Sequence, residues 1–380
     1  MMLSGIAGTA LIFLTGAYAL MILWFTVPLI RKRRNPSADH ELPPVTIIIA
    51  ARNEEPLLPA CLDSILLQDY PAERYQVLVS DDHSTDRTAE TVREYQRQFP
   101  AAGLILISAG PKEPAGKKAA IERALAMAAG EVILTTDADT SRGTGWLRAM
   151  TAGFPAGMPA MVLGPVLLTG SCFFQRLQRL EFLGIMGLTA GSAVSGTPLM
   201  CNGANLLYSK SGFFETGGFG GNRKFSSGDD QFLLAGFRKR YGRNAVTFAF
   251  RDEAVVSTPA ENTFAGFLNQ RFRWVSKSRG YRDPVVILVG AITWIFQAAL
   301  LVALVAGMFG HPIGKIALLC LGIKLVADLP LVAGMAIFFR TVADLWLYLP
   351  AQLFQVVYVP LTGLLGLILP YRWKGRLIRA

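Results

Sequence analysis

The stretch Glu131-Val132-Ile133-Leu134-Thr135-Thr136-Asp137-Ala138-Asp139 decides the fold of this chain. Its apolar, β-branched run has the composition of a buried strand, and two aspartates stand where that strand ends. Carboxylates at a strand end suit a hard divalent cation such as Mg²⁺ or Mn²⁺, which takes oxygen ligands and is often shared with substrate phosphates. Because an Asp-x-Asp triplet is common in solvated turns, its meaning depends on the rest of the chain.

The sequence around this stretch alternates between strand and helix patterns. Buried apolar runs at 45–50, 76–80 and 104–107 are expected strands, and 55–68, 84–99 and 117–129 have helical composition. This order predicts an α/β domain with a parallel sheet covered by helices, whose ligands bind at the carboxyl ends of the strands. The polar residues expected at that edge are Arg52, Asn53, Glu54, Asp81, Asp82, Asp137 and Asp139.

The chain also contains membrane-type segments. Of its 380 residues 52% are hydrophobic, and its mean hydropathy is +0.38. Segment 3–30 exceeds the roughly 20 apolar residues that a spanning helix needs, and Arg31-Lys32-Arg33-Arg34 follows it. The positive-inside rule then puts the N-terminus outside and the α/β domain in the cytoplasm, in a multi-pass protein of the cell (inner) membrane. No basic residue precedes the apolar run, which argues against a signal peptide.

Three later segments, at 284–309, 313–339 and 345–369, are further candidate spans. We therefore divide the chain into a membrane helix with its basic flank, a linker, an α/β domain, an interface helix, three C-terminal spans and a basic tail. The boundaries are 1–34, 35–44, 45–260, 261–283, 284–370 and 371–380.

Two features of the C-terminal third complicate this topology. Lys324 and Asp328 share one helix face, either as an intramembrane pair or, as we favour, near an interface that their charges reach by snorkelling. Three complete spans would leave the C-terminus outside, although its basic residues favour the cytoplasm. We predict three complete spans. The alternative is an incomplete last segment, because four residues interrupt it: Pro350, Gln352, Gln355 and Pro360.

The formal net charge of +10 is compatible with nucleic acid or anionic lipid. The basic clusters at 31–34, 271–282 and 372–379 lie beside apolar segments, which favours anionic lipid, and no nucleic-acid motif is present. Segments 172–188 and 262–281 are expected amphipathic helices, and the second is assigned to the membrane interface. The four scattered cysteines are expected to be free thiols.

Several loops carry residues of the type that binds a nucleotide. Adjacent Asp81 and Asp82 repel each other, and a hydrogen-bond donor such as the N–H of a uracil ring would stabilise one of them. Gly116-Lys117-Lys118 opens a helix, so its amides and lysines suit phosphate. It lacks the first glycine of a P-loop, which gives no support to ATPase chemistry. Residues 52–55 suit either a capped helix start or a ligand-binding loop.

Two motifs nearer the C-terminus have a structural and a functional interpretation. Ser226-Ser227-Gly228-Asp229-Asp230-Gln231 places two acids at a helix N-terminus, where the dipole favours them, but one could also be a general base. Gln270, Arg273 and Trp274 share one helix face. An arginine suits a diphosphate and an indole suits a sugar ring, although both residue types are also common at membrane interfaces.

Together and in this order, these motifs resemble the family-2 glycosyltransferases, which have the GT-A fold. The resemblance covers 45 to about 281, and the flanking spans look like those of the membrane-bound members. It implies that the metal ion bridges Asp137 and Asp139 to a diphosphate, with Asp139 as the direct ligand. It also implies that the nucleoside and sugar are bound by Asn53, Glu54, Glu55, Asp82, Lys117, Asn205, Gln270, Arg273 and Trp274.

The same resemblance implies that Asp230 is the catalytic base and that Asp229 replaces the glutamate usual at the preceding position. His83 stands where the family commonly has glycine. The expected function is transfer of a sugar, with inversion, from a nucleotide-diphosphate donor (a UDP-sugar) to a lipid acceptor. A processive polysaccharide synthase and an inactive membrane scaffold are the alternatives.

Overall fold

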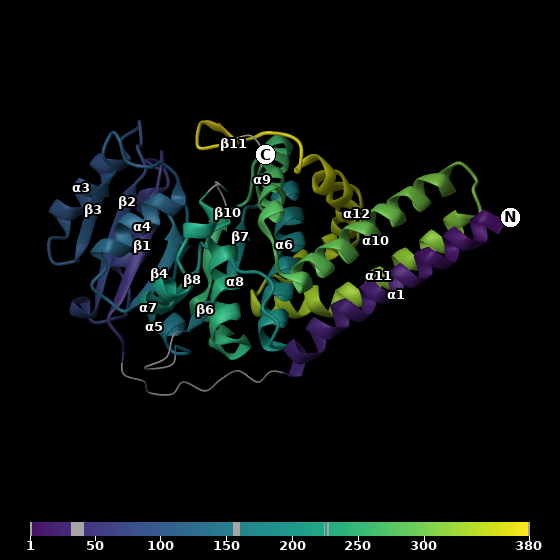
Figure 1. The fold of residues 1–380 in the computed structure, drawn as a ribbon, viewed down its shortest axis with the longest axis horizontal. Helices are drawn as coiled ribbons and strands as arrows, with labels where there is room; N and C mark the ends of the chain where they lie inside the picture. The colour runs from purple at the N-terminus through teal and green to yellow at the C-terminus, as the bar shows by residue number, and fades with distance from the viewer. Residues whose placement is uncertain (1, 32–41, 155–159, 224, 226–227, 379–380) are drawn as a thin grey trace.

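The computed structural model describes residues 2–31, 42–154, 160–223, 225 and 228–378. Its central sheet has the strand order β3-β2-β1-β4-β8-β6-β9 (Figure 1). The pairs β1–β2, β2–β3, β1–β4 and β6–β9 are parallel, whereas β8 runs antiparallel to β4 and β6. The predicted, mostly parallel α/β sheet is confirmed. Its strands are β1 (Val45–Ala51), β2 (Tyr75–Asp81), β3 (Leu104–Ser108), β4 (Val132–Asp137), β6 (Met161–Leu163), β8 (Leu206–Ser209) and β9 (Val246–Phe248).

Both faces of this sheet are buried. Ile47 and Ile49 of β1 pack against one hydrophobic core, and Ile48 between them belongs to the core on the opposite face. Such two-sided burial is why the strands read as continuous apolar runs. The covering helices are α2 (Leu58–Leu66), α3 (Thr88–Gln98), α4 (Lys117–Met127), α5 (Trp146–Thr151), α7 (Lys210–Glu215) and α8 (Asp229–Tyr241).

The strand register brings the polar loops together. Ala51 of β1 is paired with Asp81 of β2, and Ala50 is paired with Asp137 of β4. The three strands therefore end at the same edge. A smaller sheet beside them contains β5 (Ser141–Arg142), β10 (Val256–Pro259) and β7 (Val166–Thr169). Short 3₁₀ helices lie at Ala72–Arg74 (η1), Gly220–Asn222 (η2), Arg243–Ala245 (η3), Asp252–Ala254 (η4), Lys277–Gly280 (η5) and Val342–Leu347 (η6).

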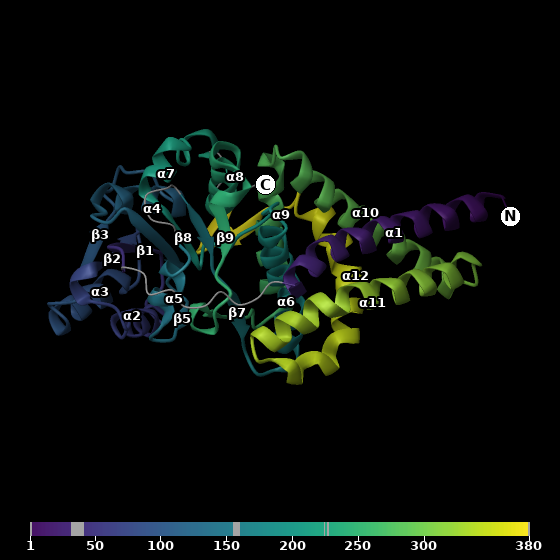
Figure 2. The same ribbon diagram turned by 90° about the horizontal axis from the view of Figure 1, so that it is seen from below.

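Among the described residues, four helical stretches are long and apolar enough to cross a membrane. They are α1 (Met2–Arg31), α10 (Pro284–Met308), α11 (Ile313–Phe338) and the stretch formed by η6 with α12 (Tyr348–Leu365). Figures 1 and 2 show α1, α10 and α11 extending together away from the sheet, with the N-terminus at their far end. The residues Lys32, Arg33 and Arg34 and the linker positions 35–41 lie outside the described residues.

Two further helices connect the sheet to this bundle. α6 (Phe173–Val194) contacts α1, α11, α12 and β7, and most of its residues are buried. The predicted amphipathic helix at 172–188 is therefore packed inside the protein. The predicted helix at 262–281 is α9 (Phe264–Ser276), which is followed by η5 and contacts α12.

The favoured interpretation of Lys324 and Asp328 was wrong. Lys324 has no exposed surface, and its Nζ lies 2.8 Å from Asp328 Oδ2. Tyr18 of α1 also donates to this carboxylate, and Gln352 and Gln355 of α12 accept from the lysine. The two charges form a pair inside the helical bundle, because the neighbouring helices supply the polar partners that lipid lacks.

The contacts of the last described residues argue against the predicted extracytoplasmic C-terminus. At the start of η6–α12, Asp344 pairs with Arg176 and Arg179 of α6 at 2.6 Å each. Beyond its end, the hairpin of β11 (Tyr371–Trp373) and β12 (Arg376–Ile378) contacts the loops of the α/β domain, where Lys374 lies 2.6 Å from Glu54. Both ends of this stretch therefore contact the α/β domain or helix α6, which favours the alternative of an incomplete last segment, and that alternative stays a prediction.

Candidate active site

The loops after β1 and β2 are joined by side chains at the edge of the sheet. The Asn53 Oδ1 atom accepts from the Thr85 amide at 2.8 Å, and the Glu55 carboxylate accepts from the Arg87 amide at 3.1 Å. The nucleoside-binding role predicted for Asn53 and Glu55 stays a prediction, and in the structure their side chains join the loop after β1 to the loop after β2. Their side chains satisfy backbone amides that β-strand pairing leaves free.

His83 adopts a backbone conformation that favours glycine. Its φ is +57°, in the left-handed region that a residue with a side chain enters at a cost. The loop therefore keeps a turn of the glycine type although histidine occupies the position. Arg52 supports it, because its guanidinium donates to the Asp82 and His83 carbonyls at 2.5 and 2.8 Å.

Glu54 and Asp82 are buried at this edge, as predicted, and both are paired with the C-terminal hairpin. Glu54 is bound by Lys374, while the Asp82 carboxylate accepts from the Gly116 amide at 2.8 Å and from Arg376 at 3.0 Å. Burial raises the pKa of Glu54 to about 7, against the opposing effect of Lys374 and with a further increase from Asp139. The two acids predicted to bind the nucleoside are thus each paired with a basic residue of the C-terminal hairpin, Lys374 or Arg376.

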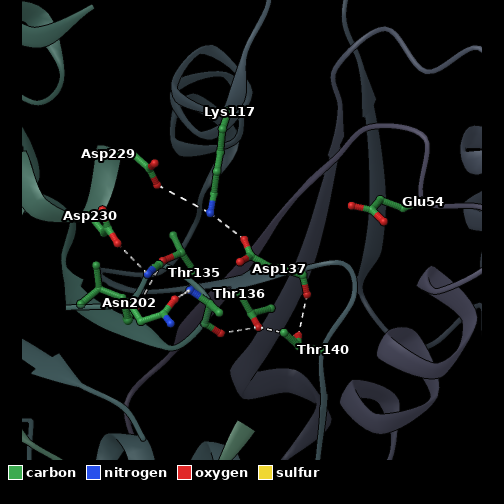
Figure 3. A network of polar contacts seen from close by, with 12 residues as sticks. Glu54, Lys117, Thr135, Thr136, Asp137, Thr140, Asn202, Asp229 and Asp230 are labelled. Atoms are coloured by element: carbon green, nitrogen blue, oxygen red, sulfur yellow. Dashed lines mark hydrogen bonds and ion pairs between the residues drawn. The ribbon is translucent and has the colours of Figure 1, made fainter. Parts of the chain in front are cut away.

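Lys117 links the acid at the end of β4 to those at the start of α8 (Figure 3). Its Nζ lies 2.6 Å from Asp137 Oδ1 and 3.7 Å from Asp229 Oδ2. Burial disfavours the ammonium, but the carboxylates outweigh it, so the pKa of Lys117 lies above its usual value. Burial likewise opposes ionisation of Asp137, but Lys117 lowers its pKa below the usual range. Lys117 is therefore held charged in the middle of an acidic cleft.

Asp139 follows Asp137 by two residues, in the turn after β4. The Thr140 hydroxyl closes this turn by donating to the Asp137 carbonyl at 2.6 Å. Burial and then the Asp137 charge raise the pKa of Asp139. A divalent cation would relieve this repulsion, and both carboxylates are hard oxygen donors, so the pair fits Mg²⁺ or Mn²⁺. Within the described part of the chain, no cluster of three or more His, Cys, Asp or Glu side chains could hold a metal. The remaining ligands would have to come from phosphate or water.

Asp230 stands at the N-terminus of α8, which follows Gly228 with a φ of +86°. Its Oδ2 accepts from the Gly203 amide at 3.2 Å, and Lys277 Nζ lies 3.6 Å from Oδ1. Figure 3 shows Asp229 and Asp230 near Lys117 and Asn202 in one network of polar contacts. Burial raises the pKa of Asp229 above its usual value, and the neighbouring Asp230 adds to the effect. Residues 226–227 of this motif lie outside the described residues.

The three motif residues of α9 have different surroundings. Arg273 lies near enough to Asp137 to help lower its pKa. Gln270 instead donates to Glu261 at 3.3 Å and accepts from Arg271 at 2.9 Å, while Trp274 packs under the Arg271 guanidinium at 4.2 Å. The structure thus brings Arg273 toward the acidic cleft. Gln270 and Trp274, which were predicted to bind the donor, are instead in contact with other protein side chains in this structure. Their role in donor binding stays a prediction.

The prediction that Asn205 binds the donor sugar stays a prediction, and the contacts of its side chain argue against it. Its side chain is fully buried and donates to the Pro165 and Ala254 carbonyls at 2.9 and 2.8 Å. Its oxygen accepts from the Trp146 indole at 3.0 Å. With its polar groups engaged, Asn205 joins β8 to neighbouring loops. Asn202, three residues earlier, lies near Asp230 in the network of Figure 3.

Sequence reasoning missed three basic residues around this site: Lys277, Lys374 and Arg376. Lys277 was counted only as part of a basic cluster, and burial opposes its charge while Asp230 raises its pKa above the usual value. The last two were assigned to a tail outside the membrane. Alternation of basic residues around Gly375, which has a φ of +79°, was the available signal for a hairpin.

Comparison with known proteins agrees with this geometry. Residues 46–227 match the model of glycosyl transferase family 2, so the chain carries a family 2 glycosyltransferase domain. The mannosyltransferase PcManGT from Pyrobaculum calidifontis, solved in complex with GDP-Man and Mn²⁺, has the same fold. Its TM-score is 0.59 at 20% identity, over 93% of this chain and 99% of that one. The GT-A fold prediction is therefore confirmed.

Two curated relatives illustrate the range of sequences that match. An N-acetylglucosaminyltransferase of Rhizobium meliloti is 28% identical over 269 residues, which are 67% of this chain and 59% of that protein. A beta-monoglucosyldiacylglycerol synthase of Synechocystis sp. is 31% identical over 112 residues, 30% of this chain and 23% of that protein. The chain thus spans about 59% of the length of the first relative and less of the second.

Proposed function

We propose that this protein is a membrane-bound inverting glycosyltransferase that moves a sugar from a nucleotide-diphosphate donor, a UDP-sugar, to a lipid acceptor at the cytoplasmic face. The observation that carries the proposal is the cleft in which Lys117 joins Asp137 to the Asp229–Asp230 pair, within a family 2 glycosyltransferase domain. It combines a place for a diphosphate with a carboxylate suited to proton removal.

In this proposal Asp230 accepts the proton of the acceptor hydroxyl. The hydroxyl oxygen bonds to the anomeric carbon as the bond from that carbon to the diphosphate breaks, and the configuration inverts. The Gly203 amide and Lys277 orient the Asp230 carboxylate for this proton transfer. Asp229 is turned toward Lys117, which leaves Asp230 as the more suitable proton acceptor.

Lys117 and Arg273 bear the positive charge that the departing diphosphate needs, and both act on Asp137 in the structure. Asp137 and Asp139 would hold Mg²⁺ or Mn²⁺, which would neutralise the leaving diphosphate when bound. PcManGT was solved with Mn²⁺, which supports a divalent cation here.

A lipid acceptor is supported by the position of the cleft. Lys277, beside Asp230, belongs to η5, which directly precedes the apolar helix α10. A hydroxyl carried by a membrane lipid could therefore reach Asp230 without leaving the bilayer surface. The name of the Synechocystis relative, a beta-monoglucosyldiacylglycerol synthase, supports the same acceptor class. Anionic lipids would be attracted by the basic residues that flank the helices.

The alternative is a polysaccharide synthase, which the Gln270-Arg271-Phe272-Arg273-Trp274 motif favours. Incubating purified protein with radiolabelled nucleotide sugars, lipid extract and Mn²⁺ would separate the possibilities. One added sugar per lipid supports the proposal, a ladder of long products supports the alternative, and no transfer with any donor supports an inactive scaffold. Asp230→Asn should abolish transfer, while Glu73→Gln, an exposed carboxylate on η1, should not.

A further inference from the structure

A buried ion pair connects α9 to the helices behind the active site. Arg271 is 4% exposed, and its Nη2 atom lies 2.5 Å from Oε2 of Glu181, which is 6% exposed, on α6. The Tyr358 hydroxyl of α12 donates to the other Glu181 oxygen. Three helices therefore meet at one carboxylate, which accepts from two of them.

The same pair arranges the motif residues of α9. The Arg271 guanidinium lies over the Trp274 ring at 4.2 Å and over Phe267 at 4.5 Å, and its Nη1 donates to Gln270. Planar stacking combined with directional donors is a property of arginine that lysine cannot reproduce. Arg271 thus fixes both the rotation of α9 about its axis and the side chains on either side of it.

One turn before Glu181, α6 also binds the segment that leads into α9. Gln178 is 1% exposed and exchanges two hydrogen bonds with the Glu261 backbone, at 2.8 and 3.1 Å. The Glu261 side chain accepts from Gln270. Gln178 and Glu181 of α6 therefore bind both the start of this segment and α9 itself.

Arg273 lies on the opposite flank of α9, two residues after Arg271. Lys277 follows it by four residues, so the two lie on the same side of the helix, and Lys277 Nζ is 3.6 Å from Asp230 Oδ1. Arg273 therefore lies on the side of α9 that faces the acidic residues of the site. Rotation or translation of α9 would move Arg273 relative to the diphosphate. We propose that Glu181, Arg271 and Tyr358 are positioning residues that set the approach of Arg273 to the donor diphosphate. This inference rests on the proposed function and extends it to a coupling between α12 and the donor site.

Electrostatics makes this arrangement sensitive to small changes. Neutralising Glu181 would leave Arg271 charged and buried without its counterion, so α9 would have to move to solvate it. A displacement of about 1 Å at a positioned group can cost about 10²-fold in rate. Glu181→Gln should therefore lower the kcat/KM for the donor by about 10- to 100-fold.

A matched control is available in a second buried ion pair that involves α6. Asp344 is a carboxylate of similar burial, 4% exposed, and it also pairs with arginines of α6, but it belongs to η6. Asp344→Asn should lower the melting temperature to a similar degree and leave the kinetics of the folded enzyme unchanged. Equal kinetic losses in Glu181→Gln and Asp344→Asn would overturn the inference.

The decisive test combines Glu181→Gln with Arg273→Ala. If Glu181 acts through Arg273, the double variant should be no worse than Arg273→Ala, whereas additive losses would overturn the inference. Tyr358→Phe, which keeps the ring, serves if Glu181→Gln does not fold, and it should give a smaller loss of the same kind. An unchanged kcat/KM in that variant would also count against the proposal.

Binding of UDP and GDP in the presence of Mn²⁺ separates failure of this inference from failure of the proposed function. Calorimetry on the wild type, Glu181→Gln and Asp344→Asn requires no transfer. Absence of transfer by the wild type would defeat the proposed function. Equal nucleotide affinities of the wild type and Glu181→Gln would defeat the positioning role.

Discussion

Arg376 Nη1 donates to Asp82 Oδ2 at 3.0 Å, across 294 residues of sequence. Together with the pair between Lys374 and Glu54, this contact sets the C-terminal hairpin on the predicted nucleoside site. The cleft below it contains an excess of carboxylates, which would repel a negatively charged donor. The hairpin cations offset that charge and give the donor site part of its electrostatic character.

Removing these cations should weaken donor binding. In a Lys374→Ala/Arg376→Ala variant, the uncompensated Glu54 and Asp82 would repel the diphosphate. The donor KM should rise about tenfold, which is about 1.4 kcal/mol. The measurement is steady-state kinetics with the donor varied. Arg372→Ala is the control, because Arg372 is exposed and contacts Asn269 through its backbone. A lower donor KM in the double variant would instead show that the hairpin obstructs the site.

The stability of the protein should depend on pH through Glu54. The folded-state pKa of this acid, about 7, is above its ordinary value of 4.5. Folding therefore favours the protonated form, and the corresponding stability is present below about pH 4.5 and is lost as the pH rises through about 7. In thermal melts between pH 5 and 8, Glu54→Gln should flatten this decline and melt higher than wild type at pH 8. An unchanged profile in the variant would contradict the assignment to Glu54.

The metal hypothesis concerns Asp139. Asp139→Asn removes a hard anionic ligand and should abolish turnover, and EDTA should have the same effect on the wild type, reversed by Mn²⁺ or Mg²⁺. The fold should survive, because Asp139 lies in a loop at the edge of the sheet. Circular dichroism would confirm this. Near-normal activity of the variant, or insensitivity of the wild type to EDTA, would refute the metal role.

The general base can be separated from donor binding. Asp230→Asn should lower kcat by about 10²–10⁴-fold, as is typical when a general base is lost. Donor affinity should persist, because Lys117 contacts Asp137 and Asp229 rather than Asp230 in this structure. A loss of donor affinity with unchanged kcat would reassign Asp230 to substrate positioning.

Local sequence was sufficient for the sheet and for the acids at its edge. The runs before Arg52, Asp82 and Asp137 are buried on both faces, and parallel strands end together, so their loops had to converge. The same reasoning did not reveal that Asn205 is buried, because the sequence around a loop asparagine is similar whether its side chain faces solvent or the interior. Burial, which decided its role, depends on Trp146 and on loops distant in sequence.

The basic residues of the site could not be found in this way. Lys374 and Arg376 contact Glu54 and Asp82 because the chain after α12 lies against the α/β domain. Hydropathy alone did not reveal this position. The hydropathy pattern also did not predict the burial of Lys324. Its partners Tyr18 and Gln352 belong to helices that are far apart in the sequence. Contacts of this kind depend on how apolar helices pack together, and their composition carries little information about it.

The topology that follows from the structure can be tested with single cysteines. After Cys61, Cys172, Cys201 and Cys320 are replaced, a cysteine at the exposed Arg372 should be protected from an impermeant thiol reagent in intact cells and should react after permeabilisation. This follows because the hairpin contacts the α/β domain. A cysteine at His311, exposed in the turn between α10 and α11, should react in intact cells, since this turn lies at the far end of the bundle, beside the N-terminal part of α1. Labelling of the Arg372 position in intact cells would restore a complete last span and contradict the hairpin contacts.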